Sequence, residues 1–308
     1  MINRVLIRIR VAQIVYAYFQ NDDSNVKNAE NNLVFSLEKS YELYFYLLSL
    51  LVEVTSIYQK RIALRKNRLL PSKEDINPDL KFAENRFVSL ISKSQQFIEF
   101  VEEHDLSWEN HENYLKNLLE RILQSQIYKD YISNPVNDFN SDREFWRKIF
   151  KQIICEDEEL DELLEDQSLY WNDDVEIVQS FVLKTIKKTN PELAEDELFL
   201  PIFKDQDDLS YAKKLLTTTL RNQVELREII DKHTQNWESE RVALMDMVIM
   251  QIAVTELLTF PSIPVNVTLN EYIDIVKAYS TNKSAGFING ILDAIVQELK
   301  KEGKLTKA

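Results

Sequence analysis

Glycine is almost missing from this chain, and that scarcity limits the available folds more than any other feature. The 308 residues include only 3 glycines, and none of them occurs before Gly286. Hairpin turns, phosphate-binding loops and nucleophile elbows depend on glycine, because glycine reaches positive φ at little cost. Glycine-rich nucleotide-binding motifs and a G-x-S-x-G elbow are accordingly absent from the sequence. The composition therefore predicts an all-α protein and argues against nucleotide-dependent enzymology.

Helical periodicity runs through almost the whole chain. Apolar residues recur at i, i+4 and i+7 in long stretches between the 7 prolines. The run from Val242 to Leu258 is apolar nearly all round, which is typical of a buried core helix that Pro261 and Pro264 then stop. No repeat of about 20–50 residues indicates a solenoid. The pattern predicts helices near residues 3–20, 32–66, 80–103, 109–132, 141–169, 173–189, 208–234, 239–260, 269–280 and 283–301.

The single cysteine and the lack of targeting segments predict a cytoplasmic protein without a membrane partner. Cys155 cannot form an internal disulfide framework, and a lone cysteine is more often a small buried apolar residue than a nucleophile. The N-terminus carries Arg4 within its apolar run and has no small-residue cleavage site. The longest apolar stretch, 45–52, is much shorter than the ~20 residues that cross a bilayer.

Charge is distributed very unevenly along the chain. The net charge is −14 at pH 7. Eleven acids and no base lie between Cys155 and Glu176, so this window alone supplies −11. The window reads as a solvated helix face, or alternatively as a docking strip for a basic partner. The first twenty residues show the opposite bias, because they hold three arginines and no acid.

Residues for enzymatic or metal chemistry are sparse. The only histidines are His104, His111 and His233. None lies in a Glu-x-x-His motif, no two are spaced i, i+4, and one cysteine cannot build a zinc site. We therefore expect no catalytic residues, metal, cofactor or small-molecule substrate.

The arginines of the first predicted helix conflict with its macrodipole. Cations at a helix N-terminus oppose the positive end of the dipole and cost ~0.3–1 kcal/mol each. Arg4 and Arg8 are i, i+4 neighbours, whereas Arg10 falls on the far side of the helix. Two explanations are open. The arginines pair with acids elsewhere in the chain, or they form a preformed site for a polyanion such as RNA.

Motifs near the C-terminus resemble those of the NusB family. They comprise Glu256-Leu257, Ile263-Pro264, Val267, Leu269-Asn270-Glu271, Lys277, Ser284 and the segment 287–293, which reads FINGILD. The opening Arg4, Arg8, Ala12-Gln13 and Tyr16 also fit the arginine-bearing first helix of that family. The resemblance covers 208–300 well and 3–20 moderately. Since NusB proteins are commonly less than half this length, much of 30–205 reads as an expansion.

The resemblance implies a fold and a function. The fold is an all-α helical bundle with two subdomains, which we place at 1–205 with the expanded middle and at 206–308. The function is transcription antitermination on ribosomal RNA operons, with binding of a single-stranded boxA RNA element. The partners are that RNA, the small-subunit ribosomal protein NusE and the RNA polymerase antitermination complex.

Site residues follow from the same resemblance. Arg4 and Arg8 would contact phosphates, Tyr279 and Phe287 would stack on bases unless they serve core packing, and Lys277 and Lys283 would add charge. Arg10 and Tyr16 complete the expected RNA surface. Asp246 would face NusE, and Gln251 is placed with it as a partner contact.

Several of these positions also have purely structural explanations. Thr268 and Glu271 have the spacing of a capping box, in which hydroxyl and carboxylate satisfy free N–H groups. Gly286 and Gly290 lie one turn apart, which permits close packing of another helix or approach of an RNA backbone.

Departures from the family pattern weaken the expected RNA surface. Val5 and Leu6 stand where basic residues are usual, Gln251 where arginine is common, and Ala285-Gly286 replace a polar-basic pair. The alternative function is therefore a helical adaptor that binds proteins of the transcription complex with little RNA affinity. A third possibility, the auxiliary domain of an RNA cytosine methyltransferase, lacks a glycine-rich cofactor loop and a Pro-Cys motif.

Overall fold

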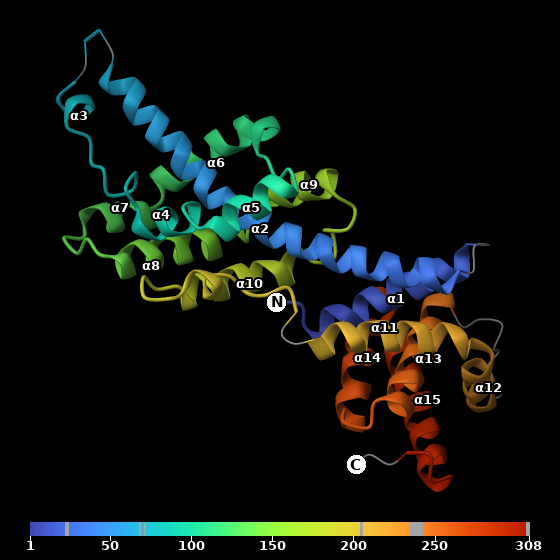
Figure 1. The fold of residues 1–308 in the computed structure, drawn as a ribbon. Coiled ribbons are helices and arrows are strands. Elements are labelled where there is room, and N and C mark those ends of the chain that lie inside the picture. Colours follow the sequence, from blue (N-terminus) through green and yellow to red (C-terminus); the bar gives the residue numbers. More distant parts are fainter. Residues whose placement is uncertain (22–24, 68, 71, 204–205, 235–242, 306–308) are drawn as a thin grey trace. The chain divides into compact units, whose positions relative to one another are not determined.

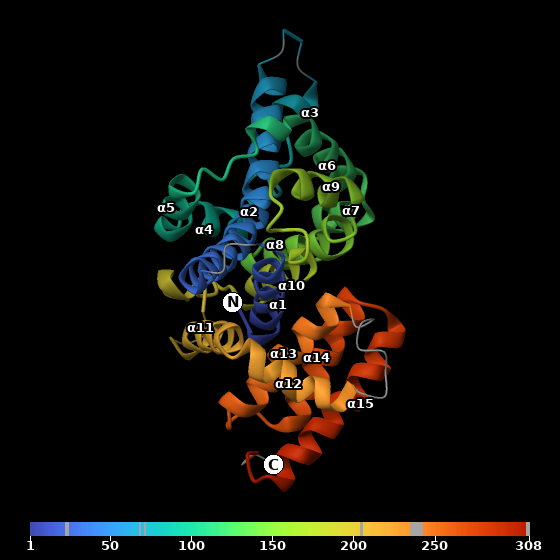
Figure 2. The same ribbon diagram turned by 90° about the vertical axis from the view of Figure 1, so that its right-hand side faces the viewer.

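The computed structural model describes residues 1–308 except 22–24, 68, 71, 204–205, 235–242 and 306–308. Its contacts divide the chain into two units. The first unit comprises Met1 and 39–202, and the second comprises 2–38 and 203–308. Figures 1 and 2 show both units as helical, which confirms the all-α prediction.

Apart from the short α3, the α-helices lie in the predicted ranges, but 80–103, 109–132, 141–169 and 208–234 each divide into two helices. Residues 239–242 of the range 239–260 lie outside the described residues. The only strand-like pairing among the described residues is an isolated parallel bridge between Ile2 and Phe203. The α-helices are α1 (Arg4–Gln20), α2 (Val26–Lys66), α3 (Lys73–Ile76), α4 (Arg86–Ser92), α5 (Gln95–Glu103), α6 (Glu112–Gln124), α7 (Gln126–Ser133), α8 (Phe139–Ile149), α9 (Glu158–Gln167), α10 (Val175–Lys188), α11 (Gln206–Arg221), α12 (Gln223–Thr234), α13 (Leu244–Thr259), α14 (Val265–Tyr279) and α15 (Asn282–Lys301). Short 3₁₀ turns occupy Glu109–His111 and Glu195–Glu197, and a π-helical turn at Phe150–Ile154 follows α8.

Local capping explains where many of these helices begin. Asn3 accepts a hydrogen bond from the Leu6 amide at 3.0 Å at the start of α1. Asp138 does the same for α8 through the Ser141 amide at 2.7 Å. Each side-chain oxygen satisfies one of the N–H groups that a helix start leaves unpaired, which stabilises the helix by ~1 kcal/mol.

The core of the second unit surrounds α13. This helix contacts α1, α11, α12, α14 and α15, so apolar side chains are needed on all of its sides. Val248, Ile252 and Val254 are completely buried. The prediction of a buried core helix is confirmed for 246–257, whereas Leu244 and Leu258 are exposed and Val242 lies outside the described residues.

The grouping of the units differs from the division expected at residues 205 and 206. The first helix packs with the C-terminal helices, because its apolar stripe contacts α11 and α13. In Figures 1 and 2 the dark blue α1 accordingly lies among the orange helices. Leu6, Ile7 and Val11 are fully buried in this contact.

The core of the first unit is aromatic and centres on α2. Tyr46 stacks on Trp108 with ring centroids 4.1 Å apart, and Phe45 stacks on Phe100 at 4.2 Å. Trp108 also donates from Nε1 to the Ser49 hydroxyl at 2.9 Å, which satisfies its polar atom inside the core. Residues 45–51 of the longest apolar stretch, 45–52, are therefore buried inside this unit, and Val52 is half-buried.

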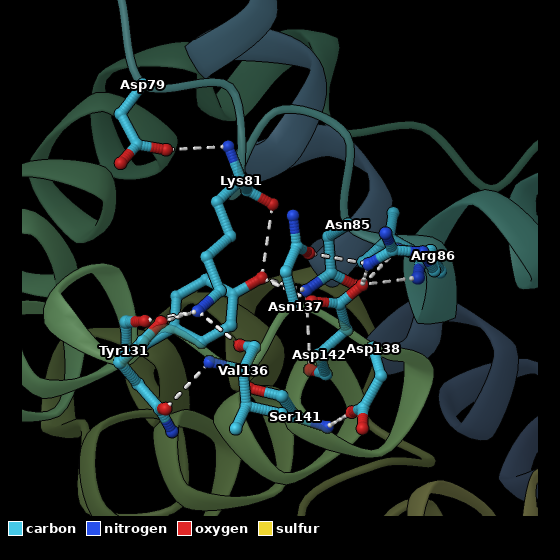
Figure 3. Close-up of polar contacts among 12 residues, drawn as sticks. Asp79, Lys81, Asn85, Arg86, Tyr131, Val136, Asn137, Asp138, Ser141 and Asp142 are labelled. Carbon is cyan, nitrogen blue, oxygen red and sulfur yellow. Dashed lines mark hydrogen bonds and ion pairs between the residues drawn. The ribbon is translucent and has the colours of Figure 1, made fainter.

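A lysine ammonium fastens two loops of the first unit together (Figure 3). Lys81 donates from Nζ to the carbonyls of Tyr131, Asn134 and Val136 at 2.7–2.8 Å, and it lies 4.5 Å from the centroid of the Tyr131 ring. The Tyr131 hydroxyl in turn donates to the buried Asp142 at 2.6 Å. All three donors of the ammonium are thus used by backbone acceptors, so the cluster reads as structural.

Neither a membrane span nor a metal cluster occurs in the part of the chain that the structure describes. None of the helices described is both long and apolar enough to cross a bilayer. Within the same residues, no group of three or more His, Cys, Asp or Glu side chains could hold a metal ion.

Candidate nucleic-acid interface

Arg8 lies in the interior of the second unit. Its side chain is 3% exposed, and it donates to both carboxylate oxygens of Glu256 at 2.8 and 3.0 Å. A third hydrogen bond reaches Glu271 at 3.2 Å. The guanidinium is therefore enclosed and already paired, so this placement does not support the expected phosphate contact of Arg8, which stays a prediction. Of the two explanations for the N-terminal arginines, intramolecular pairing holds for this residue.

Glu256 is the centre of a fully buried polar network. Besides Arg8, its carboxylate accepts hydrogen bonds from Thr268 at 2.8 Å, from Tyr272 at 3.1 Å and from Tyr211. Burial alone would raise the pKa of Glu256, but the Arg8 hydrogen bonds and charge, with those of Tyr211 and Thr268, bring it below the ordinary value. The carboxylate therefore stays ionised and joins α1, α11, α13 and α14.

The same network replaces the expected capping box. The α14 helix begins at Val265, directly after Pro264, so Thr268 and Glu271 lie inside the helix. Thr268 donates to Glu256 and Glu271 accepts from Arg8, instead of satisfying each other's backbone. The capping-box prediction is therefore wrong. Two positions of the family-like motif, Glu256 and Glu271, instead bind Arg8, and Thr268 binds Glu256.

Arg10 is also enclosed and holds a polar side chain in position. The residue is 4% exposed, and its Nη1 donates to the side-chain Oε1 of Gln13 at 2.8 Å. The Gln13 amide donates in turn to the Tyr279 hydroxyl at 3.2 Å. Arg10 is therefore placed to orient Gln13 and Tyr279, whereas a direct phosphate contact would require it to leave its buried position.

Arg4 and Tyr16 remain partly accessible at opposite ends of α1. Arg4 lies 3.8 Å from Asp208 and 5.0 Å from the centroid of the Tyr211 ring, with 43% of its side chain exposed. Tyr16 is half-buried, and its hydroxyl accepts from Gln20 at 3.3 Å. Both positions can still contact a ligand.

The turn between α14 and α15 gathers the remaining expected RNA residues. Tyr279 ends α14 and is half-buried, and Phe287, in the second turn of α15, is half-buried as well. Lys277 is exposed but bonded to Asp274 at 2.7 Å. Lys283 is exposed and makes no ion pair with any residue that the structure describes. The first turn of α15 carries no acid.

The two helix glycines face open space. A Cβ built at Gly286 or at Gly290 would meet nothing within 4 Å, and both residues are exposed. Close packing against another helix is therefore not why glycine occurs here. The other explanation, approach of a ligand backbone to this face of α15, stays open.

The two expected partner contacts lie inside the protein. Asp246 and Gln251 are 5% and 3% exposed, because α13 is packed on all sides. The Gln251 amide donates to the Gln223 carbonyl at 3.2 Å. Asp246 Oδ1 has no hydrogen-bond partner among the described residues. Neither side chain presents an exposed surface in this structure, and their roles as partner contacts stay predictions.

The acidic window is mostly solvated, as its composition suggests, with two exceptions. Nine of its eleven acids are exposed. Asp157 is buried and accepts hydrogen bonds from Tyr114 at 2.8 Å and from Arg121 at 2.9 Å, and the buried Asp174 accepts from Ser40. Cys155, at the start of the window, is half-buried, and burial followed by the nearby acids raises the pKa of its thiol to about 12.

Sequence reasoning missed Gln13 and Glu256 as site residues. A usable signal existed for Glu256, because a carboxylate in an otherwise apolar core helix requires a buried cation. No local signal names that cation, since Arg8 lies 248 residues away along the chain.

Part of this chain resembles known proteins. The model of the NusB family matches residues 173–297, which include α10 to α14 and most of α15. A transcription antitermination protein NusB from Salinibacter ruber is 41% identical over 108 residues, which make up 35% of this chain and 68% of that protein. No solved structure matches the chain.

Two further relatives carry the same name. The transcription antitermination protein NusB of Chloroherpeton thalassium is 42% identical over 95 residues, or 31% of this chain and 45% of that protein. That of Natranaerobius thermophilus is 35% identical over 95 residues, or 31% of this chain and 68% of that protein. At 308 residues, with this identity and this all-helical fold, the chain belongs to the NusB family as an expanded member.

Proposed function

We propose that this protein is a transcription antitermination factor that binds a boxA-type single-stranded RNA together with NusE. It would act on ribosomal RNA transcription within the RNA polymerase antitermination complex, in the cytoplasm. Membership in the NusB family and the names of the relatives support antitermination. The boxA-type RNA, the NusE partner and the ribosomal RNA operon are proposed in addition to antitermination.

The surface at the α14–α15 turn is the observation that carries RNA binding. Tyr279 and Phe287 are accessible enough to stack on unpaired bases, and base–aromatic stacking contributes ~1–3 kcal/mol per base. Gln13 fixes the Tyr279 hydroxyl, which holds the ring in place before RNA arrives. Preorganisation of this kind lowers the entropy cost of binding.

Charge at the same turn supports phosphate binding. Lys283 lies in the first turn of α15, where free backbone N–H groups and the helix dipole also favour an anion. The exposed Gly286 and Gly290 on the following turns leave room for a sugar–phosphate backbone. Arg8 and Arg10 do not belong to this direct surface, since they support it from inside.

The test is a titration of a labelled boxA-like RNA with the protein, alone and with NusE. Lys283→Glu with Phe287→Ala should weaken binding at least tenfold in both arms. Lys184→Glu, an exposed lysine of α10 in the first unit, is the matched control and should leave binding unchanged. The assignment of this surface would be contradicted if the control lost RNA binding, or if the double variant bound RNA as well as the unmodified protein does.

A second candidate function has its own observation. Arg8, one of the few cations expected on the RNA face, is neutralised by Glu256. This favours an adaptor that binds NusE and other proteins and has little RNA affinity of its own. Saturable NusE binding without RNA binding, even in the ternary mixture, would favour the adaptor.

A further inference from the structure

The first unit contains a large groove outside the region that the family model matches. Its volume is about 1080 Å³, and α2, α5, α6 and the segment 106–109 line it. The apolar part of the lining includes Val52, Ile57, Phe97, Leu115 and Leu119. Val52 and Ile57 remain half-buried, so the α2 wall retains apolar surface that another molecule can cover.

The length of the groove matches that of a short helix. Trp108 is level with Ser49, to which it donates a hydrogen bond at 2.9 Å. Arg61, twelve residues after Ser49, is ion-paired with Glu120, which lies twelve residues after Trp108. Ser49 and Arg61 therefore mark the two ends of the α2 wall, which at 1.5 Å per residue is roughly 18 Å long. The α6 wall, which begins at Glu112, lines the later part of the groove.

The two ends of the groove carry opposite charges. Glu53 and Glu109 line the end near Trp108, whereas Lys60 and Arg65 line the end near Arg61. None of these four makes an ion pair with any residue that the structure describes. Helix-dipole compensation accounts for a cation in the last turn of α2, such as Arg65, but not for Lys60, which lies before that turn.

A large apolar side chain extends the groove at its basic end. Leu64 is 72% exposed and lies among the lining residues. Isolated exposed leucines are common, but this one continues a larger apolar lining between charged rims. Apolar floor and charged rim are the arrangement that helix-in-groove recognition uses.

We propose that this groove docks one amphipathic α-helix from a protein partner. The apolar stripe of that helix, at i, i+3, i+4 and i+7, covers Val52, Ile57 and Leu64. Its basic residues lie beside Glu53 and Glu109, and its acidic residues lie beside Lys60 and Arg65. This interaction is independent of the RNA surface, because it belongs to the expanded part of the chain.

The probe is a labelled 18-residue helical peptide with a leucine stripe, lysines in one half and glutamates in the other. Fluorescence anisotropy with the full chain should give saturable binding. Replacing the peptide leucines by serine should weaken it at least tenfold. Ile57→Gln in the protein should do the same, with circular dichroism to verify that the variant is folded.

Charge variants test the polarity of the groove. Lys60→Glu with Arg65→Glu should weaken peptide binding at least tenfold. A peptide with lysines in both halves should bind this variant with the original affinity. Lys66→Glu, an exposed neighbour outside the lining, is the matched control and should change binding less than twofold. Absence of saturable peptide binding would overturn the proposal. The proposal would also be overturned if a single-stranded RNA bound the full chain, lost that binding in the Lys60/Arg65 variant and kept it in Ile57→Gln.

Discussion

The guanidinium of Arg8 and the carboxylate of Glu256 form a two-point hydrogen-bonded pair, at 2.8 and 3.0 Å, in the interior of the second unit. The pair connects the first helix of the chain to the core helix α13, across 248 residues of sequence. Removing one member of a buried pair leaves an uncompensated charge, which costs more than the pair itself contributes.

We therefore expect Arg8→Ala to lower the free energy of unfolding of the second unit by about 3–5 kcal/mol. The double variant Arg8→Met with Glu256→Gln should lose less, because no charge is then left buried. Urea denaturation of the three proteins checks this. A loss below 1 kcal/mol for Arg8→Ala would contradict the network described for Glu256.

The same pair predicts how stability depends on pH. The pKa of Glu256 is lowered in the folded protein from an ordinary value of 4.5. Its contribution is therefore fully present above that pH and is lost as the pH falls through the folded pKa. The melting temperature should decline below about pH 4.5, and Glu256→Gln should show a shallower decline. Equal slopes for both proteins would mean that other carboxylates dominate acid unfolding.

Much of the fold could be predicted from the sequence, because helix signals are local. The apolar spacing and the prolines placed α1, α10, α13 and α15 within a few residues of their ends. The π-helical turn 150–154 inside a predicted continuous helix was not visible, since its apolar spacing still looks helical. The packing of α1 with the C-terminal helices depends on contacts between distant segments, so periodicity alone could not give it.

The candidate site was harder to predict than the fold, because exposure decides its chemistry. The sequence places Arg4 and Arg8 on the same side of the first helix, yet Arg8 is buried and Arg4 keeps 43% of its side chain exposed. Gly286 and Gly290 have the spacing of a packing motif, yet they face open space. The burial of Asp246 and Gln251 follows from five helices surrounding α13, which a one-dimensional pattern does not contain.

Lys81 gives a prediction for the first unit. Lys81→Met removes three hydrogen bonds to carbonyls near the end of α7 and should lower the free energy of unfolding by about 1–3 kcal/mol. Lys129→Met, an exposed lysine on α7, is the matched control and should change it by less than about 0.5 kcal/mol. Similar values for both variants in denaturant titrations would mean that the cluster does not stabilise the loops.

The acidic window separates solvated from structural carboxylates. Replacing Glu162, Glu165, Asp166 and Asp173 by the corresponding amides should leave the melting temperature unchanged or slightly raised, because exposed like charges repel. Asp157→Asn should instead cost about 1–3 kcal/mol, since Tyr114 and Arg121 lose their acceptor charge. If the variant with four replaced acids kept its stability but no longer bound a basic partner, the window would be identified as a docking strip.

The salt dependence of RNA binding tests the central claim most directly. For a single-stranded nucleic acid, the negative slope of log K against log[salt] becomes shallower by about 0.7 for each phosphate contact removed. Lys277→Gln with Lys283→Gln should therefore weaken boxA-like RNA and flatten the slope by about 1.4, with an unchanged melting temperature. Lys184→Gln with Lys187→Gln on α10 should leave both quantities as in the unmodified protein. An unchanged slope in the Lys277/Lys283 variant, or an equal change in the α10 control, would contradict RNA binding at the α14–α15 turn.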